Sequence, residues 1–461
     1  MAILTPKRVP RWRAKHGRIS FSRLRLRNFK CHEDTGDLNL RPLTILVGAN
    51  NAGKSSILQG LLMLRQTMGL LQQDLHVVTS GPLVDMGGFH DILRKGTKGE
   101  NPAFGMEFEV TYFEGPHIKK RLRPKGPSFP GKPQKAALCV SFGFDRSQAR
   151  IKLMAAKMMD KGETIVEVRR SHGKLQLVGP REKWLRYASV QRFLFLPYFH
   201  PKTNVPKRLQ ETINKRGVKS FEWMGKWAGI FHNVRHIAPL RSSVPRMSVI
   251  GRVEPPAPGG SGEQAVRLLW ERGRDPAERI DLVKDTSDWM TKRMHLLSRL
   301  RLQPIDPKKR VMSLVGDELD GPRGIDLASM GEGFSQLLPI LANVLGASFH
   351  ECVVIEQPEA HLHPSAQADL ADLFIDQIIF GRADQFIIET HSEHFILRVQ
   401  RRIADKTLDP SLVSILHVEK KEGRPMIHHV EVSSKGGITW PGGFFEEGFE
   451  EALALANAAE S

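Results

Sequence analysis

The chain carries at residues 48–55 the sequence Gly48-Ala49-Asn50-Asn51-Ala52-Gly53-Lys54-Ser55, which matches the pattern G-x4-G-K-[ST]. Glycines at this spacing allow the backbone to wrap so that successive N–H groups point at phosphate oxygens, at the positive end of the following helix. Lys54 would reach the β- and γ-phosphates of a nucleotide, and Ser55 would offer its hydroxyl to Mg²⁺. The sequence therefore predicts a phosphate loop.

The residues on either side supply the structural context that a phosphate loop needs. Leu43–Val47 is a short apolar run, typical of a buried parallel strand, and Ser56–Met68 has apolar residues at helical spacing. Strand, glycine loop and helix follow one another, which favours a phosphate loop over a surface glycine turn.

Three later segments indicate which class of phosphate-loop protein the chain resembles. Cys352–Glu359 is a hydrophobic strand that ends in acids, as a Mg²⁺ ligand requires, and Ser329–Glu332 precedes an amphipathic helix. A second apolar strand, Gln385–Glu389, ends in Thr390-His391-Ser392. The strand-end acid and histidine would project toward the same edge of a parallel sheet, where such sheets bind ligands.

This arrangement resembles the ATP-binding-cassette class of ATPase heads, which includes the SMC and RecF heads. The resemblance implies an α/β phosphate-loop ATPase head, with a mixed sheet flanked by helices and no long coiled coil, which binds ATP and Mg²⁺ and dimerises around ATP. In that class the segment from Ser329 to Glu332 would be the signature that clamps the γ-phosphate bound to a second subunit. His391 would be the switch histidine.

Further motifs are similar to the OLD-like, RecF-related family of stand-alone bacterial AAA ATPases: Glu356–Pro364, Gly331–Pro339 and Glu389–Glu393. Asn28-Phe29-Lys30 resembles that family's N-F-[KR] stretch near the adenine, and Trp440–Phe445 its W-P-x-G-F-F ending. Pro239-Leu240-Arg241 resembles its P-L-R, and residues 116–235 have no match. Several such ATPases accompany nuclease or toxin effectors in anti-phage systems of the Septu and PARIS kind. The resemblance therefore implies an effector partner in trans.

The predicted site has three sets of residues. Catalytic candidates are Glu356, Gln357, Glu359 and His391, and the predicted metal ligands are Ser55 and Glu356. The residues predicted to hold the nucleotide are Asn28, Phe29, Lys30, Gly48, Asn50, Asn51, Ala52, Gly53, Lys54, Ser55, Ser56, Ser329, Gly331 and Glu332. His361 and His363 lack a third nearby ligand, so a structural role is favoured over a metal site.

Gln357 departs from the pattern of active heads, which have a catalytic glutamate after the Mg²⁺ acid. An amide cannot accept the proton of an attacking water as a carboxylate can. Two hypotheses follow: Glu359 or His391 positions the water and hydrolysis is slow, or ATP holds a dimer closed as a scaffold that sequesters its effector. A RecF-like DNA-binding repair ATPase is a third hypothesis, supported by the basic segments.

Basic residues are concentrated in two segments. Lys and Arg number 68 against 50 Asp and Glu, a formal net charge of +18. Residues 1–30 hold ten basic residues and no acid, and Lys119–Lys135 holds seven with four prolines. Such segments neutralise nucleic-acid phosphates or remain solvated, and charge alone does not choose between them. Double-stranded DNA is therefore an open partner.

Cysteine usage and hydropathy indicate a cytoplasmic, soluble protein. The three cysteines are widely spaced, which excludes a disulfide framework and a Cys-based zinc site. No apolar run reaches the roughly 18 residues of a membrane helix, and no secretory h-region follows the initiator Met.

The sequence divides into six predicted segments: a basic arm (1–18), the N-terminal half of the head (19–115), an inserted lobe with a basic loop (116–235), a linker and helical segment (236–310), the C-terminal half (311–435), and the W-P-G-G-F-F segment with an acidic tail (436–461). Helices are predicted over Gly333–Leu345, Ser365–Phe380 and Glu393–Ile403, with helical periodicity over 263–302 broken near Pro276. Strands are predicted over Ile19–Leu26, Phe104–Phe113, Ala137–Phe144, Thr164–Arg169, Ser411–Val418 and Met426–Val432.

Overall fold

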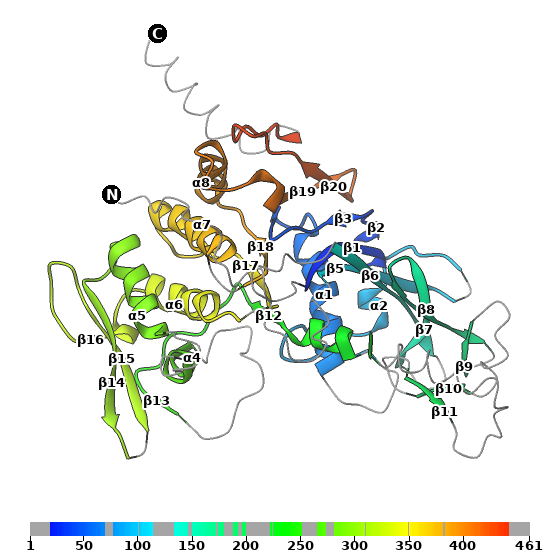
Figure 1. The fold of residues 1–461 in the computed structure, drawn as a ribbon, viewed down its shortest axis with the longest axis horizontal. Helices are drawn as coiled ribbons and strands as arrows, with labels where there is room; N and C mark the ends of the chain where they lie inside the picture. The colour runs from blue at the N-terminus through cyan, green and yellow to red at the C-terminus, as the bar shows by residue number, and fades with distance from the viewer. Residues whose placement is uncertain are drawn as a thin grey trace, which may run out of the picture.

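The computed structural model describes residues 19–69, 77–99, 101–113, 133–145, 150–171, 174–178, 188–191, 196–199, 222–223, 225–250, 265–272, 281–308, 310–348, 350–380 and 383–441 (Figure 1). The predicted basic arm, most of the basic loop, and the chain from Gly442 onward, with the rest of the W-P-G-G-F-F segment and the acidic tail, lie outside the described residues.

A six-stranded sheet forms the centre of the molecule. Its order is β12-β17-β18-β4-β19-β20, and all neighbours are parallel except β19 and β20. The strands are β4 (Leu43–Val47), β12 (Val234–Ile237), β17 (Cys352–Glu356), β18 (Gln385–Glu389), β19 (Val413–Lys421) and β20 (Arg424–Val430). The carboxyl ends of the five parallel strands therefore meet at one edge.

Alternate residues of these strands enter two different cores. Ile45 and Val353 belong to the core on one face, whereas Leu46 and Val354 belong to the core on the other. Nearly continuous apolar strands with both faces covered are typical of parallel sheets.

Helices cover one face of the sheet, and a small antiparallel sheet adjoins them (Figure 1). The helices are α4 (Ala265–Arg272), α5 (Leu282–Asp288), α6 (Glu332–Leu345), α7 (Pro364–Ile379) and α8 (Glu393–Ala404), with a π-helical turn at Trp289–Arg293. The small sheet consists of β13 (Ser248–Val249), β14 (Arg299–Asp306), β15 (Val311–Asp317) and β16 (Ile325–Asp326).

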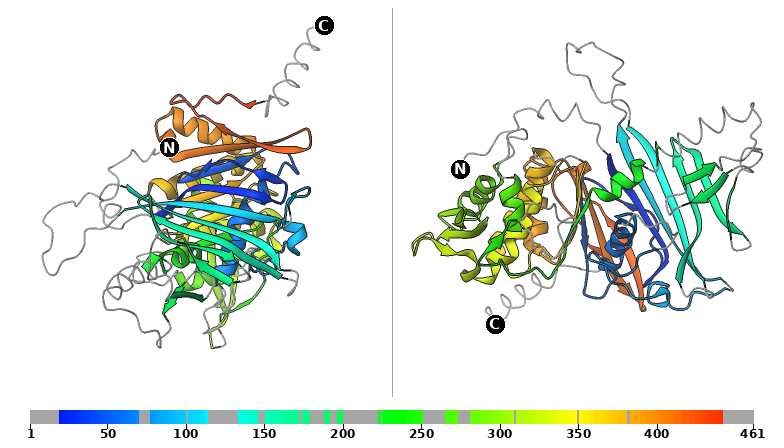
Figure 2. Two further views of the ribbon diagram at one scale, coloured as in Figure 1. Left: turned by 90° about the vertical axis from the view of Figure 1, so that its right-hand side faces the viewer. Right: turned by 90° about the horizontal axis from the view of Figure 1, so that it is seen from below.

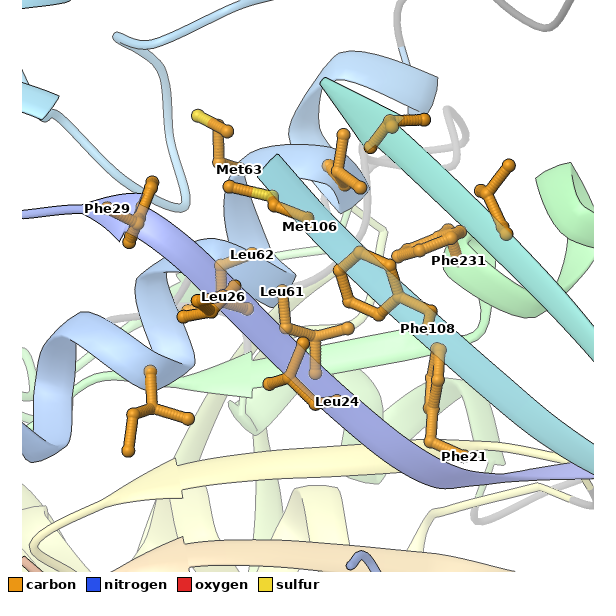
Figure 3. Packing of buried hydrophobic residues seen from close by; sticks show 14 of the residues in the cluster. Phe21, Leu24, Leu26, Phe29, Leu61, Leu62, Met63, Met106, Phe108 and Phe231 are labelled. Atoms are coloured by element: carbon orange, nitrogen blue, oxygen red, sulfur yellow. The ribbon is translucent and has the colours of Figure 1, made fainter. Parts of the chain in front are cut away.

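On the other face, α1 (Lys54–Gly69) lies between the central sheet and an antiparallel sheet (Figure 2). Figure 3 shows Leu61 and Leu62 of α1 beside Leu24, Leu26 and Phe108 of the antiparallel strands. The sheet has the order β2-β1-β5-β6-β7-β8-β9, with β3 paired to β1. Its strands are β1 (Ile19–Phe29), β2 (His32–Asp34), β3 (Leu38–Asn39), β5 (Ala103–Phe113), β6 (Pro133–Asp145), β7 (Arg150–Asp160), β8 (Glu163–Ser171) and β9 (Lys174–Leu177).

Shorter elements complete the described fold. They are α2 (Phe89–Ile92), the paired strands β10 (Ala188–Gln191) and β11 (Leu196–Phe199), a helical segment at residues 225–232, and 3-10 turns at Leu327–Ser329 and Pro410–Leu412. No helix in the described part of the chain is long and apolar enough to cross a membrane.

Three predictions from the sequence differ from the structure. Strands β6 to β9 continue the sheet of β1 and β5, so this part of residues 116–235 is not a separate lobe. The helical periodicity predicted over 263–302 ends earlier, because β14 begins at Arg299 and pairs with β15. The boundary at 235/236 also falls inside β12 of the central sheet.

Candidate functional site

The loop between β4 and α1 has a backbone that only glycine permits at two positions. Gly48 has a φ of +143°, and a Cβ there would lie 2.0 Å from the main-chain oxygen of Val418. Gly53 has a φ of +111°, and a Cβ there would lie 2.8 Å from the Sγ of Cys31. Since a side chain would clash at both positions, the glycines of the motif are required by the loop's path.

Lys54 begins α1 with its ammonium group at the base of this loop. Its side chain is 3% exposed, and Nζ donates to the main-chain oxygens of Gly48 (2.9 Å) and Ala49 (2.8 Å). Burial lowers the pKa of Lys54, and the charge of Glu389 opposes that shift. Asn50 and Asn51 at the tip of the loop are exposed, and Ala52 is buried. The loop thus combines an exposed backbone with a buried cation, an arrangement suited to a phosphate.

Ser55, the next residue, meets a carboxylate from a neighbouring strand. Its Oγ donates to Oε1 of Glu389 at 3.0 Å, and the same Oε1 lies 4.0 Å from Nζ of Lys54. Glu389 ends β18 directly opposite Leu46 of β4, and the residue is 4% exposed. Its Oε2 is buried and has no hydrogen-bond partner among the described residues. Burial, followed by the charge of Glu356, raises the pKa of Glu389 to about 7.

Glu356, the predicted Mg²⁺ acid, contacts a different strand. Its Oε1 lies 2.7 Å from Nε2 of His236 on β12, and both side chains are largely buried. No hydrogen bond between the described residues joins Glu356 to Ser55. His236 Nδ1 is buried and has no partner in the described part of the chain.

Arg241 follows β12 and binds the turn after β17. Its Nη2 donates to the main-chain oxygens of Glu356 (2.8 Å) and Gln357 (2.9 Å). The residue is 6% exposed, and burial lowers its pKa to about 10. Gln336 of α6 donates through Nε2 to the main-chain oxygen of Arg241 at 3.1 Å. Arg241 therefore connects α6 to the end of β17.

Gln357 and Glu359 are both held by the end of β18. Gln357 has a φ of +46°, a left-handed conformation unfavourable for a non-glycine residue, and its N–H donates to the main-chain oxygen of Glu389 at 2.7 Å. Glu359 accepts from Thr390 Oγ1 (2.8 Å) and from the main-chain N–H of His391 (2.6 Å). Burial raises the pKa of Glu359. Both carboxylate oxygens are thus already bound within the chain.

His391 leaves one ring nitrogen unused. Its Nε2 is buried and without a hydrogen-bond partner among the described residues. Burial, and then the charge of Lys54, lowers the pKa of His391. The neutral ring near Lys54 is therefore available to a polar group of a ligand.

The turn after β1 borders an open cleft of about 790 Å³. Lys30, Cys31, α2 and the β19–β20 hairpin line this cleft. Cys31 Sγ donates to Oγ of Ser56 at 3.7 Å, which brings the cleft to the start of α1. Phe29 is fully buried with its ring 5.8 Å from Phe104, and Asn28 Nδ2 donates to the main-chain oxygen of Ala103 at 3.3 Å. Phe29 and Asn28 thus support the turn, whereas Lys30 faces the cleft.

The predicted signature residues lie on the surface at the start of α6. Ser329, Gly331 and Glu332 are exposed, and the side chain of Glu332 is 85% exposed. Gly331 precedes α6 without a side-chain cap. Among the described residues, no hydrogen bond or ion pair joins these three to the phosphate loop. Within the described chain the signature segment therefore supplies no polar contact to the phosphate loop.

The donor set at Ser55 suits a hard cation. A hydroxyl and a carboxylate lie 3.0 Å apart, and one carboxylate oxygen is buried without a partner. Mg²⁺ binds such oxygen ligands together with phosphates and water. In contrast, His363 caps α7 by accepting from the N–H of Ser365 at 3.4 Å, which is the structural role favoured for it. The described residues contain no group of three His, Cys, Asp or Glu side chains that could hold a metal.

Three residues join the site that the sequence did not assign to it: Glu389, His236 and Arg241. In the sequence, Glu389 ends the second predicted strand, and Arg241 belongs to the P-L-R motif. His236 carried no sequence signal.

Two segments of the chain, residues 21–94 and 285–396, match the family model described as AAA ATPase domain. Together they hold the phosphate loop, the signature segment, the acids after β17 and the histidine after β18. No curated protein matches the sequence.

Solved structures with similar folds include SMC heads. The chain aligns with an SMC head bound to the C-winged helix domain of ScpA (12% identity, 90% of this chain and 98% of that chain, TM-score 0.39). It also aligns with a Pyrococcus furiosus Smc head bound to the C-terminal domain of ScpA (11%, 96% and 100%, TM-score 0.42) and with the SMC head domain from Thermotoga maritima (12%, 89% and 99%, TM-score 0.37). The chain itself has a mixed α/β phosphate-loop ATPase fold. That assignment rests on its own strand order and loop geometry.

Proposed function

We propose that this protein is a Mg²⁺-dependent ATPase head that binds ATP at the loop between β4 and α1. The glycine-only path of that loop, with Lys54 buried at its base, carries the proposal. The AAA ATPase domain match supports ATP binding and hydrolysis in general. The cleft beside Lys30 and Cys31 is the region for the base and sugar, because it reaches Ser56 at the start of α1.

Hydrolysis needs a group that orients water at the γ-phosphate. Mg²⁺, when bound, would neutralise the charge that develops on the phosphates. Glu359 is poorly suited to orient the water, because Thr390 and His391 already occupy both of its oxygens. His391 has a free Nε2 and a lowered pKa, so it suits a contact with the γ-phosphate or the water. Gln357 can orient a water but cannot take its proton.

The signature segment requires a second subunit. Ser329, Gly331 and Glu332 are exposed, and no hydrogen bond or ion pair of the described residues joins them to the phosphate loop. A second copy would bring its Ser329 to the ATP held by Lys54, so that each site is shared between two subunits. ATP binding would then control assembly of the pair.

Control of a separate effector, a nuclease or toxin in anti-phage defence, is the biological role that we propose for this pair. Its support is the resemblance of the motifs Glu356–Pro364, Glu389–Glu393 and the W-P segment to stand-alone ATPases of such systems. Trp440, the first residue of that last segment, packs edge-on against His417 of β19 with ring centroids 6.4 Å apart. This contact would link the segment to the sheet that carries the phosphate loop.

A scaffold that binds ATP without hydrolysing it is the second candidate. Gln357 favours it, together with the engagement of Glu359 within the chain. A RecF-like repair ATPase is the third, and it predicts strongly salt-dependent binding to double-stranded DNA with no effector.

Steady-state ATP hydrolysis by the wild type, Lys54→Ala and Gln357→Glu, with and without double-stranded DNA, tests the proposal. Wild-type turnover that is lost in Lys54→Ala supports an active ATPase. Turnover that occurs only in Gln357→Glu supports the scaffold. A parallel nucleotide titration is the control: failure of both the wild type and Gln357→Glu to bind ATP would exclude all three candidates.

A further inference from the structure

We propose that Arg241 binds the terminal phosphate of ATP through the guanidinium N–H groups that it does not use to hold the turn after β17. The inference rests on the proposed function, since it requires ATP at the phosphate loop. It adds a phosphate contact from the segment after β12 to that of Lys54, and it leaves Glu356 as the predicted acid for Mg²⁺. Through this contact the site would distinguish ATP from ADP.

The unused donors of a buried cation are the first observation. Arg241 is 6% exposed, and its Nη2 makes both hydrogen bonds of the guanidinium to the main-chain oxygens of Glu356 and Gln357. Nε and Nη1 are buried and have no hydrogen-bond partner in the described part of the chain. Buried polar groups are normally paired, because an unpaired donor costs stability. A ligand that accepts from these N–H groups would reduce that cost.

The charge of Arg241 indicates what kind of ligand this is. Among the described residues, the guanidinium is bound by two neutral main-chain oxygens and by no carboxylate. Burial lowers the pKa of Arg241, although the charges of Glu359 and Glu356 raise it. A guanidinium is favoured in a buried site when an anion accepts its hydrogen bonds, and phosphate is the anion that it binds most often in nucleotide sites. The expected ligand is therefore a phosphate group.

The strand order places Arg241 on the same side of the sheet as the phosphate loop. β4, β18, β17 and β12 are consecutive in the sheet, and their carboxyl ends meet at one edge. Because the guanidinium binds the oxygens that end β17, it lies about two strand spacings, roughly 10 Å, from the strand that leads into the loop. His391, whose Nε2 is also buried without a described partner, follows the strand between them. A triphosphate that extends from the loop across β18 would approach both donors.

The position of the unused donors also sets a condition on binding. Nε and Nη1 are shielded from solvent, so contact with a phosphate requires a small movement of the segment that covers them. Gln336 of α6 donates to the main-chain oxygen of Arg241, and α6 begins at the signature segment. The movement would therefore occur beside the residues that we expect to meet a second subunit.

Binding of ADP and of the non-hydrolysable analogue AMP-PNP, measured by calorimetry in Mg²⁺ and in excess EDTA, tests the inference without turnover. The wild type should bind AMP-PNP more tightly than ADP in both conditions. Arg241→Ala should lose about 10- to 100-fold of this preference with little change in its affinity for ADP, as expected when a charge-assisted hydrogen bond is removed. The EDTA series excludes a displaced Glu356 as the cause, because no metal then connects that acid to the nucleotide. Arg246→Ala, the matched control, removes an exposed cation of the same segment and should keep the wild-type preference.

The outcomes separate this inference from the proposed function. An unchanged preference in Arg241→Ala, or an equal loss of affinity for ADP and AMP-PNP, overturns the inference alone, since the second result is that of a residue that merely holds the turn. Absence of AMP-PNP binding by the folded wild type, or binding that is unchanged in Lys54→Ala, overturns both.

Two further measurements apply if Arg241→Ala does not fold, which thermal unfolding would reveal. Arg241→Met fills a similar volume without the charge and should show the same loss of preference, and a wild-type preference in that variant overturns the inference. A crystal structure of the wild type with AMP-PNP should place a phosphate oxygen within about 3 Å of Nη1 or Nε of Arg241. A water molecule at both nitrogens, with no phosphate oxygen in reach, would also overturn it.

Discussion

His236 Nε2 lies 2.7 Å from Glu356 Oε1, which joins the edge strand of the central sheet to the acid that ends β17. We expect His236→Ala to lower kcat for ATP about 10- to 100-fold, because the carboxylate of Glu356, a candidate catalytic residue, loses the partner that positions it. Binding of ATP should change little, since no hydrogen bond between the described residues joins His236 to the phosphate loop. His236→Gln restores an N–H donor and should recover part of the rate. Equal rates for the Ala and Gln variants would exclude the hydrogen bond as the cause.

Arg241 fixes the turn after β17 through two main-chain oxygens, and this predicts a positioning role. Arg241→Ala should reduce turnover and leave Gln357 free to relax from its left-handed conformation, which costs about 1–2 kcal/mol to hold. Arg246 is exposed, and Arg246→Ala is the matched control that should keep wild-type turnover. Nucleotide binding measured beside turnover distinguishes a defect in hydrolysis from a defect in folding. Similar losses in both variants would contradict the role assigned to Arg241.

Gly48→Ala should abolish ATP binding, because the added Cβ would lie 2.0 Å from the main-chain oxygen of Val418. Gly36→Ala is the control: Gly36 also has a positive φ (+65°), but a Cβ there meets nothing within 4 Å. Both variants bear the cost of a left-handed alanine, about 1 kcal/mol, and only Gly48→Ala adds the clash. Thermal unfolding and nucleotide titration should therefore separate them. Equal effects would show that the clash relaxes.

Ser329→Arg should abolish turnover while sparing ATP binding, because Ser329 is exposed and would act on the ATP of a second subunit. A mixture of Ser329→Arg and Lys54→Ala subunits should regain activity, since each mixed pair contains one site with both residues intact. Ser411→Arg, at another exposed serine, should leave turnover unchanged. Full turnover of Ser329→Arg alone would exclude the shared site.

Asp376 on α7 predicts a pH dependence of stability. Burial raises its pKa to about 6, against the opposing charge of Arg293 at 3.2 Å, with Asp372 adding to the shift and Arg402 opposing it. Because the pKa is raised, the stabilising contribution of the protonated form is complete below about pH 4 and is lost as pH rises through 6. Asp376→Asn should remove this dependence and should raise the free energy of unfolding at pH 8 on the order of 2 kcal/mol. Urea unfolding at pH 5 and pH 8 measures it, and a wild-type difference that persists in the variant would refute the assignment.

Local patterns predicted the elements around the phosphate loop. Leu43–Val47 and Gln385–Glu389 are strands with the predicted bounds, and α1 begins two residues before the predicted start. The sequence did not predict β7, because Ala, Met and Lys within Arg150–Asp160 favour a helix as much as a strand. A register shift in its pairing with β6 also interrupts the alternation.

The partners of the predicted site residues could not be derived in the same way. The contact of Ser55 with Glu389 depends on β18 lying between β4 and β17, and that of Glu356 with His236 depends on β12 lying beside β17. No periodicity along the chain encodes which strands become neighbours. The sequence could therefore indicate which residues gather at the sheet edge, but not which of them touch.

The position of β4 between β18 and β19 also determines when the central sheet can form during synthesis on the ribosome. Ser55 and Glu389, which meet at the sheet edge, are 334 positions apart in the sequence. At about 5–20 residues per second, the phosphate-loop strand waits roughly 20–70 s for its neighbours after it has been synthesised. β1 and β5 are synthesised close to α1 and can shield its apolar face during this interval, while both edges of β4 remain unpaired and prone to aggregation. Nascent chains stalled before Gln385 should therefore be the species that most require a chaperone.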